Sequence, residues 1–197
     1  MSFVDKAITV LRNSGTILIP TDTHFALAAD PFCPDAVEKM TLLKTSLCAK
    51  ELTFCFCDVA DIWEWVDVSP WQRSKMDALS RAFWPGPLKI SLRKNRQAPS
   101  LAGSGATLSV VCVKNSQMRS IIRQLGRPLV VIPAGYPQDE NSLVSFTLAR
   151  EDMGDIVDLV VPSNCRSPSR LATTHISLLD DKISVIRHGE LDISSLL

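Results

Sequence analysis

The feature that most constrains this chain is a polar segment between two apolar runs near its N-terminus. Residues 17–30 read ILIPTDTHFALAAD, with apolar runs at 17–19 and 25–29. Each run has the composition of a short buried strand. A plain hairpin between them would use Asn-Gly or Asp-Gly at its turn, whereas this connection has no glycine. It carries hydroxyl, carboxylate and imidazole groups instead, on Thr21, Asp22, Thr23 and His24.

Further helical and strand patterns continue to the C-terminus. Apolar residues at helical spacing and N-cap signals predict helices at 2–15, 33–45, 59–66, 69–83, 116–126 and 140–152. Short apolar runs predict strands at 16–20, 52–58, 88–94, 107–113, 128–133, 155–161, 174–179 and 182–187. The elements alternate without strict βαβ regularity. We therefore expect an α/β (α+β) single domain over residues 1–197, with a twisted mixed sheet packed against helices.

Charge and hydropathy exclude several classes of protein. The 21 basic residues balance the 21 acidic ones, which argues against a strongly electrostatic nucleic-acid binder. The N-terminus lacks the basic and apolar regions of a signal peptide. No apolar run approaches the ~18 residues that span a bilayer, so we expect a cytoplasmic protein that does not bind membranes.

Cysteines and histidines give no sign of a metal site. The six cysteines include no C-x-x-C pair, and we expect reduced, mostly buried thiols. His24, His175 and His188 show no i, i+4 ligand spacing. His24 and His175 each follow a threonine and could meet in one cavity, either as a general base or as buried, hydrogen-bonded histidines. No G-x-S-x-G motif supports a Ser-His-Asp hydrolase.

Several segments, in order, resemble the YrdC-type domain family, which includes threonylcarbamoyl-adenylate synthases. The stretch ILIPTDTHFALAAD is similar to P-T-D/E-T-x-Y-G-L-x-x-D, and VEKMTLLKTSLCAKELTFCF to a helix and strand with K-x-R-P and then P-L. FWPGPLKISL is similar to W-P-G-P-L-T, and GRPLVVIPAG takes the place of G-x-P-L-x-x-T-S-A-N. ATTHISLLDDKISVIRHG resembles S-T-V/I-V/I-D followed by L-R-x-G. The resemblance implies a YrdC-like fold with a central cavity.

The resemblance also implies an activity and site residues. Family members make threonylcarbamoyl-adenylate from L-threonine, bicarbonate and ATP for a transfer-RNA modification, with ATP and Mg²⁺ as co-substrates and no tightly bound cofactor. It assigns a threonine-like ligand to Thr23 and Thr173, a nucleotide to Thr21, Lys44 and Arg187, and further cavity positions to Asp22, His24, Thr174 and His175. The alternative for the first segment is local: Thr21 and Asp22 cap the strand end and a turn.

Other family positions are replaced. The arginine of K-x-R-P is Ser46, and the arginine that ends the V-x-V-R strand is Cys112. In T-S-A-N, the serine and asparagine positions are Pro133 and Gly135. Serine and cysteine cannot replace the bidentate contacts of guanidinium groups with phosphate. We therefore predict a divergent relative with weakened or lost synthase activity, with Lys50 and Lys114 as candidate substitutes.

Two other function classes stay open. One is a non-catalytic relative that binds a nucleotide, double-stranded RNA, transfer RNA or a transfer-RNA modification protein, and the other is a binder of a different small ligand. The helix at 116–126 carries Arg119 and Arg123 on one face, near Lys114. This pattern fits an RNA-facing basic stripe and equally a solvated amphipathic face.

Overall fold

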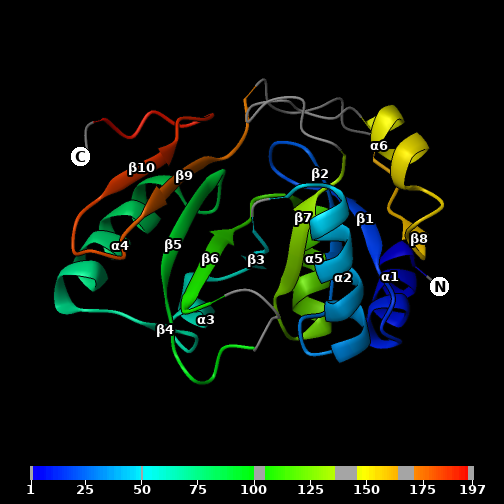
Figure 1. Cartoon of the computed structure of the whole chain (residues 1–197), viewed down its shortest axis with the longest axis horizontal. Helices are drawn as coiled ribbons and strands as arrows, with labels where there is room; N and C mark the ends of the chain where they lie inside the picture. The colour runs from blue at the N-terminus through cyan, green and yellow to red at the C-terminus, as the bar shows by residue number, and fades with distance from the viewer. Residues whose placement is uncertain (1, 50, 100–104, 136–145, 164–170, 195–197) are drawn as a thin grey trace.

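The computed structural model consists mainly of one large mixed sheet (Figure 1). It describes residues 2–49, 51–99, 105–135, 146–163 and 171–194. The described strands are β1 (Ile17–Pro20), β2 (Phe25–Ala29), β3 (Thr53–Phe56), β4 (Val66–Asp67), β5 (Leu88–Lys94), β6 (Thr107–Cys112), β7 (Leu129–Pro133), β8 (Leu159–Val160), β9 (Thr174–Ser177) and β10 (Ser184–Arg187). The described helices are α1 (Phe3–Arg12), α2 (Pro34–Ser46), α3 (Val59–Ile62), α4 (Pro70–Phe83), α5 (Ser116–Leu125) and α6 (Phe146–Met153).

The described strands form a 10-stranded sheet whose order differs greatly from their order in the sequence. The order is β10-β9-β5-β6-β3-β7-β2-β1-β8, and β4 pairs with β5. The pairs β1–β8, β3–β6 and β5–β9 are parallel, and the other pairs are antiparallel. The predicted mixed α/β fold is confirmed. None of the helices among the described residues is long and apolar enough to cross a membrane.

The two faces of the sheet bury separate sets of alternate side chains. One face, here the α4 face, includes Leu18, Phe54 and Ile90 and packs against α2, α4 and α6. The other, here the α5 face, includes Ile19 and Cys55 and packs against α1 and α5. Figure 1 shows α1 at one end of the sheet, whereas β9 and β10 lie at the other.

Local signals account for several helix ends. Ser2 and Ser69 each form a capping box at the start of α1 and α4, as their sequence patterns indicate. Gly126 ends α5 in the left-handed conformation that favours glycine. The N-cap of α5 is Asn115, whose side-chain oxygen accepts a hydrogen bond from the Met118 amide.

The predicted helix at 59–66 is wrong in its second half. The helix ends at Ile62, and Val66 pairs with Lys94 in the β4–β5 ladder. Trp65 packs edge-on against Phe54 and Phe56, with ring centroids 5.6 and 5.4 Å apart. Packing of this large ring against β3 therefore outweighs the weak helix propensity of a segment rich in tryptophan and valine.

Candidate functional site

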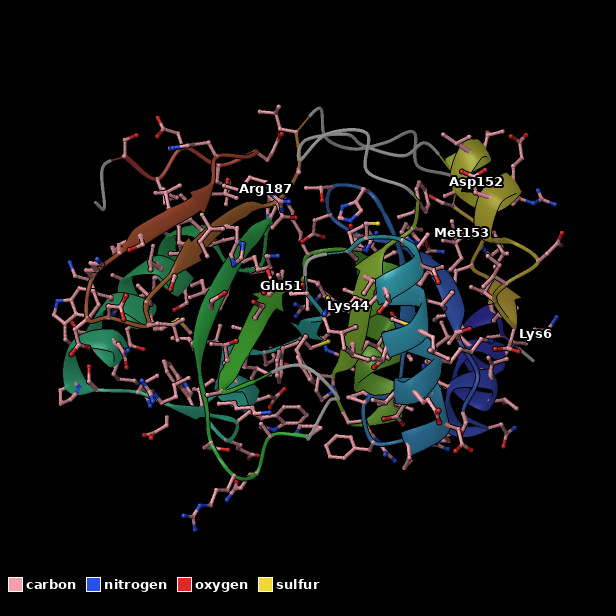
Figure 2. The ribbon with its side chains drawn as sticks, viewed as in Figure 1. Lys6, Lys44, Glu51, Asp152, Met153 and Arg187 are labelled. Carbon is pink, nitrogen blue, oxygen red and sulfur yellow. The ribbon has the colours of Figure 1, made fainter. Side chains whose placement is uncertain are left out.

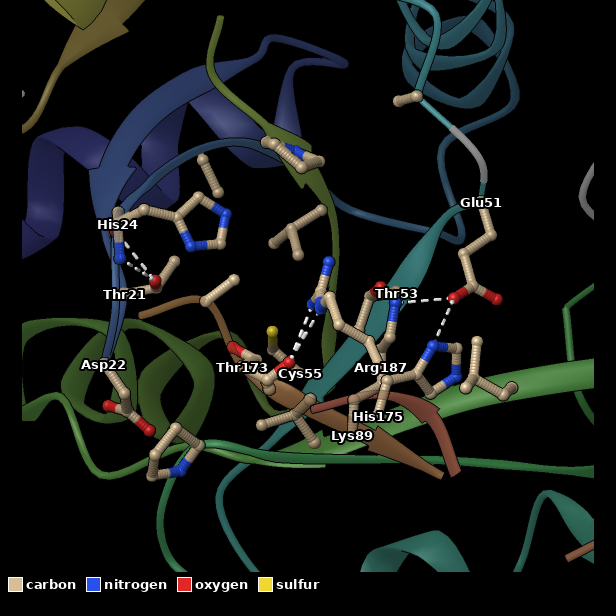
Figure 3. A pocket seen from close by; sticks show the side chains of 18 of the residues that line it. Thr21, Asp22, His24, Glu51, Thr53, Cys55, Lys89, Thr173, His175 and Arg187 are labelled. Atoms are coloured by element: carbon tan, nitrogen blue, oxygen red, sulfur yellow. Dashed lines mark hydrogen bonds and ion pairs between the residues drawn. The ribbon is translucent and has the colours of Figure 1, made fainter. Parts of the chain in front are cut away.

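A cavity of about 580 Å³ opens on the α5 face, beyond the area that α1 and α5 cover (Figure 3). Cys55, Val111 and Val131 belong both to the core of this face and to the cavity wall. The polar and charged side chains of the described wall come from both halves of the chain: Thr21, Asp22, His24, Glu51, Thr53, Lys89, Ser91, Thr107, Thr173, His175 and Arg187. Strand pairing rather than sequence proximity therefore builds the site.

The Thr21–His24 segment is a self-bonded turn between β1 and β2. The Thr21 amide and hydroxyl both donate to the His24 carbonyl oxygen, at 2.7 Å each. The Thr21 hydroxyl oxygen accepts in turn from the amides of Thr23 and His24, at 3.3 and 3.1 Å. Local capping is thus present, and the same turn lines the cavity, so the two interpretations of this segment are compatible.

Asp22 fastens this turn to the start of α5. Its carboxylate accepts hydrogen bonds from the amides of Lys114, at 2.9 Å, and Asn115, at 2.6 Å. Burial raises the pKa of Asp22, and the two amide hydrogen bonds oppose that rise. The carboxylate at a helix N-terminus is a favourable arrangement, which indicates that Asp22 positions the turn.

Thr23 joins the first motif to the C-terminal one. Its hydroxyl lies 2.8 Å from His24 Nδ1 and 3.1 Å from the hydroxyl of Thr173. Thr23 is fully buried and lies behind the wall, whereas Thr173 lines the cavity. The Arg187 guanidinium donates to the Thr173 carbonyl oxygen from Nε, at 3.0 Å, and from Nη2, at 2.8 Å. These four predicted site residues therefore form one connected group.

His24 lines the cavity in an environment that favours its neutral form. Burial lowers the pKa of His24 to about 4, and the nearby charges of Arg187 and Lys89 contribute to the shift. His175 lines the same cavity but contacts other groups, since its Nε2 lies 2.8 Å from the Ser91 hydroxyl. Both histidines therefore line one cavity, but no hydrogen bond described joins them.

A second polar group occupies the β5–β9 side of the cavity. Glu51, just before β3, forms an ion pair with Lys89 and accepts a hydrogen bond from Ser109. His175 Nδ1 lies 3.5 Å from the same carboxylate. Figure 2 shows Glu51 and Arg187 in the middle of the molecule, between the β5 end of the sheet and α2. Sequence reasoning missed Glu51, Lys89, Ser91 and Ser109 as site residues.

A periodic signal in β5 marks part of this group. Lys89 and Ser91 alternate with the buried Leu88, Ile90 and Leu92. Alternate side chains of a strand point to opposite faces, so the pattern places Lys89 and Ser91 together on the α5 face, whereas Leu88, Ile90 and Leu92 lie on the α4 face. The carboxylate partner Glu51 carries no comparable signal, because it precedes its strand.

Besides Thr23, two more predicted site residues do not line the cavity. Thr174 faces the other side of β9 from His175, and its hydroxyl donates to the Leu191 carbonyl oxygen at 3.0 Å. Lys44 lies in the last turn of α2, where Cys48 and Ala49, just after the helix, line the cavity instead. The candidate substitute Lys50 lies outside the described residues.

The replaced family positions bring few donors to the site. Pro133 and Gly135 line the cavity without a hydroxyl or amide side chain. Cys112 faces the α4 face, where its thiol donates to the Cys57 carbonyl oxygen at 3.1 Å. Arg119 Nη1 donates to that carbonyl at 2.7 Å and to the Val113 carbonyl at 2.9 Å. Arg119 therefore supports the interior rather than a basic surface stripe.

Comparisons with known proteins agree with this architecture. A family model described as Telomere recombination, for Sua5, YciO and YrdC, matches residues 9–189. The threonylcarbamoyl-AMP synthase of Coxiella burnetii is 26% identical over 180 residues, covering 87% of this chain and 93% of the relative. The Escherichia coli YciO structure superposes with a TM-score of 0.84 at 21% identity, covering 98% of this chain and 92% of YciO.

A structure of P. abyssi Sua5 complexed with L-threonine is also similar. Its TM-score is 0.84 at 20% identity, and the match covers 98% of this chain but 56% of Sua5. The chain thus spans little more than half the length of that protein. At these identities, the structural matches establish the fold.

Proposed function

The chain belongs to the Sua5/YciO/YrdC family, and from that premise we propose that its cavity binds L-threonine and ATP as a divergent threonylcarbamoyl-AMP synthase-like protein. We propose further that its synthase activity is weakened or lost. ATP and Mg²⁺ are then co-substrates, and no tightly bound cofactor is needed. The proposed setting is cytoplasmic, with transfer-RNA modification proteins as partners.

The observation that carries this proposal is the hydroxyl contact between two motifs 150 residues apart. Thr23 and Thr173 meet at 3.1 Å, and Arg187 holds the carbonyl of Thr173. We propose that Thr173 hydrogen-bonds a threonine-like ligand and that Arg187 attracts an anionic phosphate. A direct contact of Thr23 with threonine stays a prediction, because the described geometry supports an indirect role through Thr173.

Weakened catalysis follows from the donors that are missing. Phosphoryl and acyl transfer depend on charged and polar groups aimed at the developing negative charge. In this chain, Ser46 and Cys112 occupy the positions of two family arginines. Pro133 and Gly135 occupy the serine and asparagine positions and provide no side-chain donors. Each lost charge-assisted hydrogen bond is worth about 1.5–3 kcal/mol, so two of them correspond to about 10²- to 10⁴-fold in rate or affinity.

Calorimetric titration with ATP and Mg²⁺, with and without L-threonine, tests the proposal. We expect micromolar ATP binding that threonine strengthens, together with pyrophosphate release far slower than that of the Coxiella burnetii relative assayed in parallel. Release at the relative's rate would contradict the loss of activity. No heat with either ligand would contradict the proposed substrates.

A non-catalytic nucleotide-binding role is the second candidate, and the absence of side-chain donors at Pro133 and Gly135 favours it. Binding of ATP with no pyrophosphate release would support this role. An RNA-binding role requires another surface than the predicted stripe, because Arg119 is committed to backbone carbonyl groups. Affinity for transfer RNA that falls steeply with salt would support such a surface.

A further inference from the structure

Four neighbouring strands carry polar side chains that meet beside the cavity. In the order β9-β5-β6-β3, His175 lies on β9, Ser91 on β5, Ser109 on β6 and Glu51 just before β3. Ser91 is the register partner of Ser109, and His175 is that of Lys89, two residues before Ser91. Alternate residues of a strand share a face, so Ser91 and His175 point to the same side of the sheet. Pairing of strands distant in the sequence therefore builds this group, part of which Figure 3 shows.

Ser91 and His175 have the geometry of a nucleophile and its base. The Ser91 hydroxyl oxygen lies 2.8 Å from His175 Nε2, within the range of about 2.6–3.2 Å that such pairs show. Both residues are buried, and both line the cavity, so a ligand in the cavity can contact the pair. Catalytic serine–histidine pairs are recognised by geometry rather than by sequence position. The lack of a G-x-S-x-G motif therefore does not argue against this one.

The Ser91 hydroxyl has two neighbours to which it can donate. Its oxygen lies 2.9 Å from the Ser109 hydroxyl oxygen as well as 2.8 Å from His175 Nε2. Ser109 donates its own proton to Glu51 Oε2, at 2.5 Å, so its oxygen can accept from Ser91. A serine hydroxyl rotates to suit its partners. Donation to Ser109 is thus one arrangement of Ser91, and donation to His175 is the arrangement that nucleophilic attack requires.

Glu51 brings negative charge to the other edge of the His175 ring. Its carboxylate lies 3.5 Å from Nδ1, and at this separation it acts through its charge rather than through a short hydrogen bond. Burial disfavours the charge of Glu51, but the charge and hydrogen bond of Lys89 outweigh this and lower its pKa. A carboxylate beside the ring stabilises the imidazolium that forms when a catalytic histidine accepts a proton.

His175 departs from the motif that the chain resembles. It stands at the first aliphatic position of S-T-V/I-V/I-D. The resemblance places His175 in the cavity but gives it no chemical task. Since an aliphatic side chain cannot accept a proton, the pair of Ser91 and His175 adds a nucleophile and a base that the motif does not include.

We propose that Ser91, His175 and Glu51 form an acyl-transfer site that hydrolyses a small carboxylic ester. The Ser91 oxygen bonds to the ester carbonyl carbon as His175 Nε2 takes the hydroxyl proton. The C–O bond to the alcohol then breaks, and the alcohol leaves with that proton. Water next attacks the acyl group on Ser91 and gives a proton to His175, which returns it to the Ser91 oxygen as the carboxylic acid leaves. This activity goes beyond the proposed function and does not depend on it.

Two reagents applied to the full chain test the site. Diisopropyl fluorophosphate phosphorylates an activated serine with release of fluoride, and peptide mass spectrometry locates the adduct. Hydrolysis of p-nitrophenyl acetate releases p-nitrophenol, which absorbance measures. We expect an adduct on Ser91 and ester hydrolysis above the uncatalysed rate. Ser91→Ala should abolish the adduct and lower hydrolysis about 100-fold, whereas Ser74→Ala, at an exposed serine of α4, should resemble the parent chain.

Variants of the other two residues separate their roles. His175→Gln removes the base and should also lower hydrolysis about 100-fold. Glu51 is a positioning residue, so Glu51→Gln should lower kcat about tenfold and leave KM unchanged, and Glu51→Asp, which keeps the charge, should recover most of that loss. Equal kcat in the parent, Glu51→Gln and Glu51→Asp would remove Glu51 from the site. If His175→Gln does not fold, Ser91→Ala and the position of the adduct still decide the matter.

The outcomes separate this inference from the proposed function. An adduct on another residue alone, or hydrolysis that survives Ser91→Ala, would overturn the site while ATP and threonine binding stood. A folded chain that gives neither adduct nor hydrolysis would overturn it as well, and would show that the polar group only joins the strands. Labelling of Ser91 in a chain that binds neither ATP nor threonine would support the site and count against the proposed function.

Discussion

The two ends of the cavity are held in place by different kinds of interaction. At one end, the Thr21–His24 turn is held by hydrogen bonds among neighbours in the sequence and by the Thr23–Thr173 contact. At the other end, an ion pair joins Glu51 and Lys89, which are 38 residues apart in the sequence. The first end keeps the P-T-D-T residues of its family motif and is held mainly by hydrogen bonds to backbone groups and hydroxyls, whereas the second departs from its motif and is held by an ion pair. Retained motifs thus do not reveal where the cavity carries its charge.

The two histidines of the cavity lie in different electrostatic surroundings. His24 lies near cations with no carboxylate in its described contacts, and burial lowers its pKa to about 4. His175 lies beside Glu51, whose carboxylate is 3.5 Å from the ring nitrogen Nδ1. The same residue type thus lies near cations at one end and beside a carboxylate at the other. Four experiments test this contrast.

The largest effect is expected from Glu51→Gln. It removes the negative charge beside Lys89 and His175, and we expect a loss of about 2 kcal/mol in the free energy of unfolding, reduced from the value for fully buried pairs because the Glu51 side chain is 33% exposed. Urea denaturation measures this loss. Glu38→Gln, on the exposed surface of α2, is the matched control; equal loss in both variants would refute the role of Glu51.

Acid should destabilise the chain through His24. Its folded-state pKa of about 4 lies below the ordinary value of 6.5, so the unfolded chain binds more protons between these pH values. Stability from this group is complete above about pH 6.5 and is lost as pH falls towards about 4, by roughly 1–2 kcal/mol after allowance for partial exposure. Denaturation of the parent and of His24→Gln across this range measures the effect; identical pH profiles would count against it.

A smaller effect is expected from Thr23→Val. The change keeps the branched shape but removes the hydroxyl that joins His24 to Thr173, which should cost about 1–1.5 kcal/mol of stability. Threonine affinity should fall as well, because Thr173 loses its positioning partner. Thr45→Val, on the exposed end of α2, should change threonine affinity little; the reverse order of effects would show that Thr23 does not position the site.

The smallest effect is expected from Pro133→Ser, which returns a motif donor to the cavity wall. One added hydroxyl contact is worth about 0.5–1.5 kcal/mol, which corresponds to a gain of about 2- to 10-fold in ATP affinity. Calorimetry at fixed Mg²⁺ measures the gain. The companion change at Gly135 is less suitable, because its φ of 138° is a conformation that favours glycine. Unchanged affinity would place the phosphates away from β7.

Much of the architecture was determined locally by the sequence. Apolar runs and helical spacing located most strands and helices, Ser2 and Ser69 marked helix starts, and the polar segment at 21–24 pointed to the cavity. These signals act over a few residues, through side-chain periodicity and backbone capping, and so can be read without knowing the fold.

Only the tertiary structure decided which charges meet. The adjacency of Lys89, His175 and Arg187 depends on β9 lying parallel to β5 and antiparallel to β10 in one particular register. The inward turn of Arg119 likewise depends on carbonyl groups at Cys57 and Val113. A one-residue change of register moves every side chain of a strand to the opposite face. Because that register is set by packing across the whole sheet, the sequence determined the strands, and their pairing determined the site.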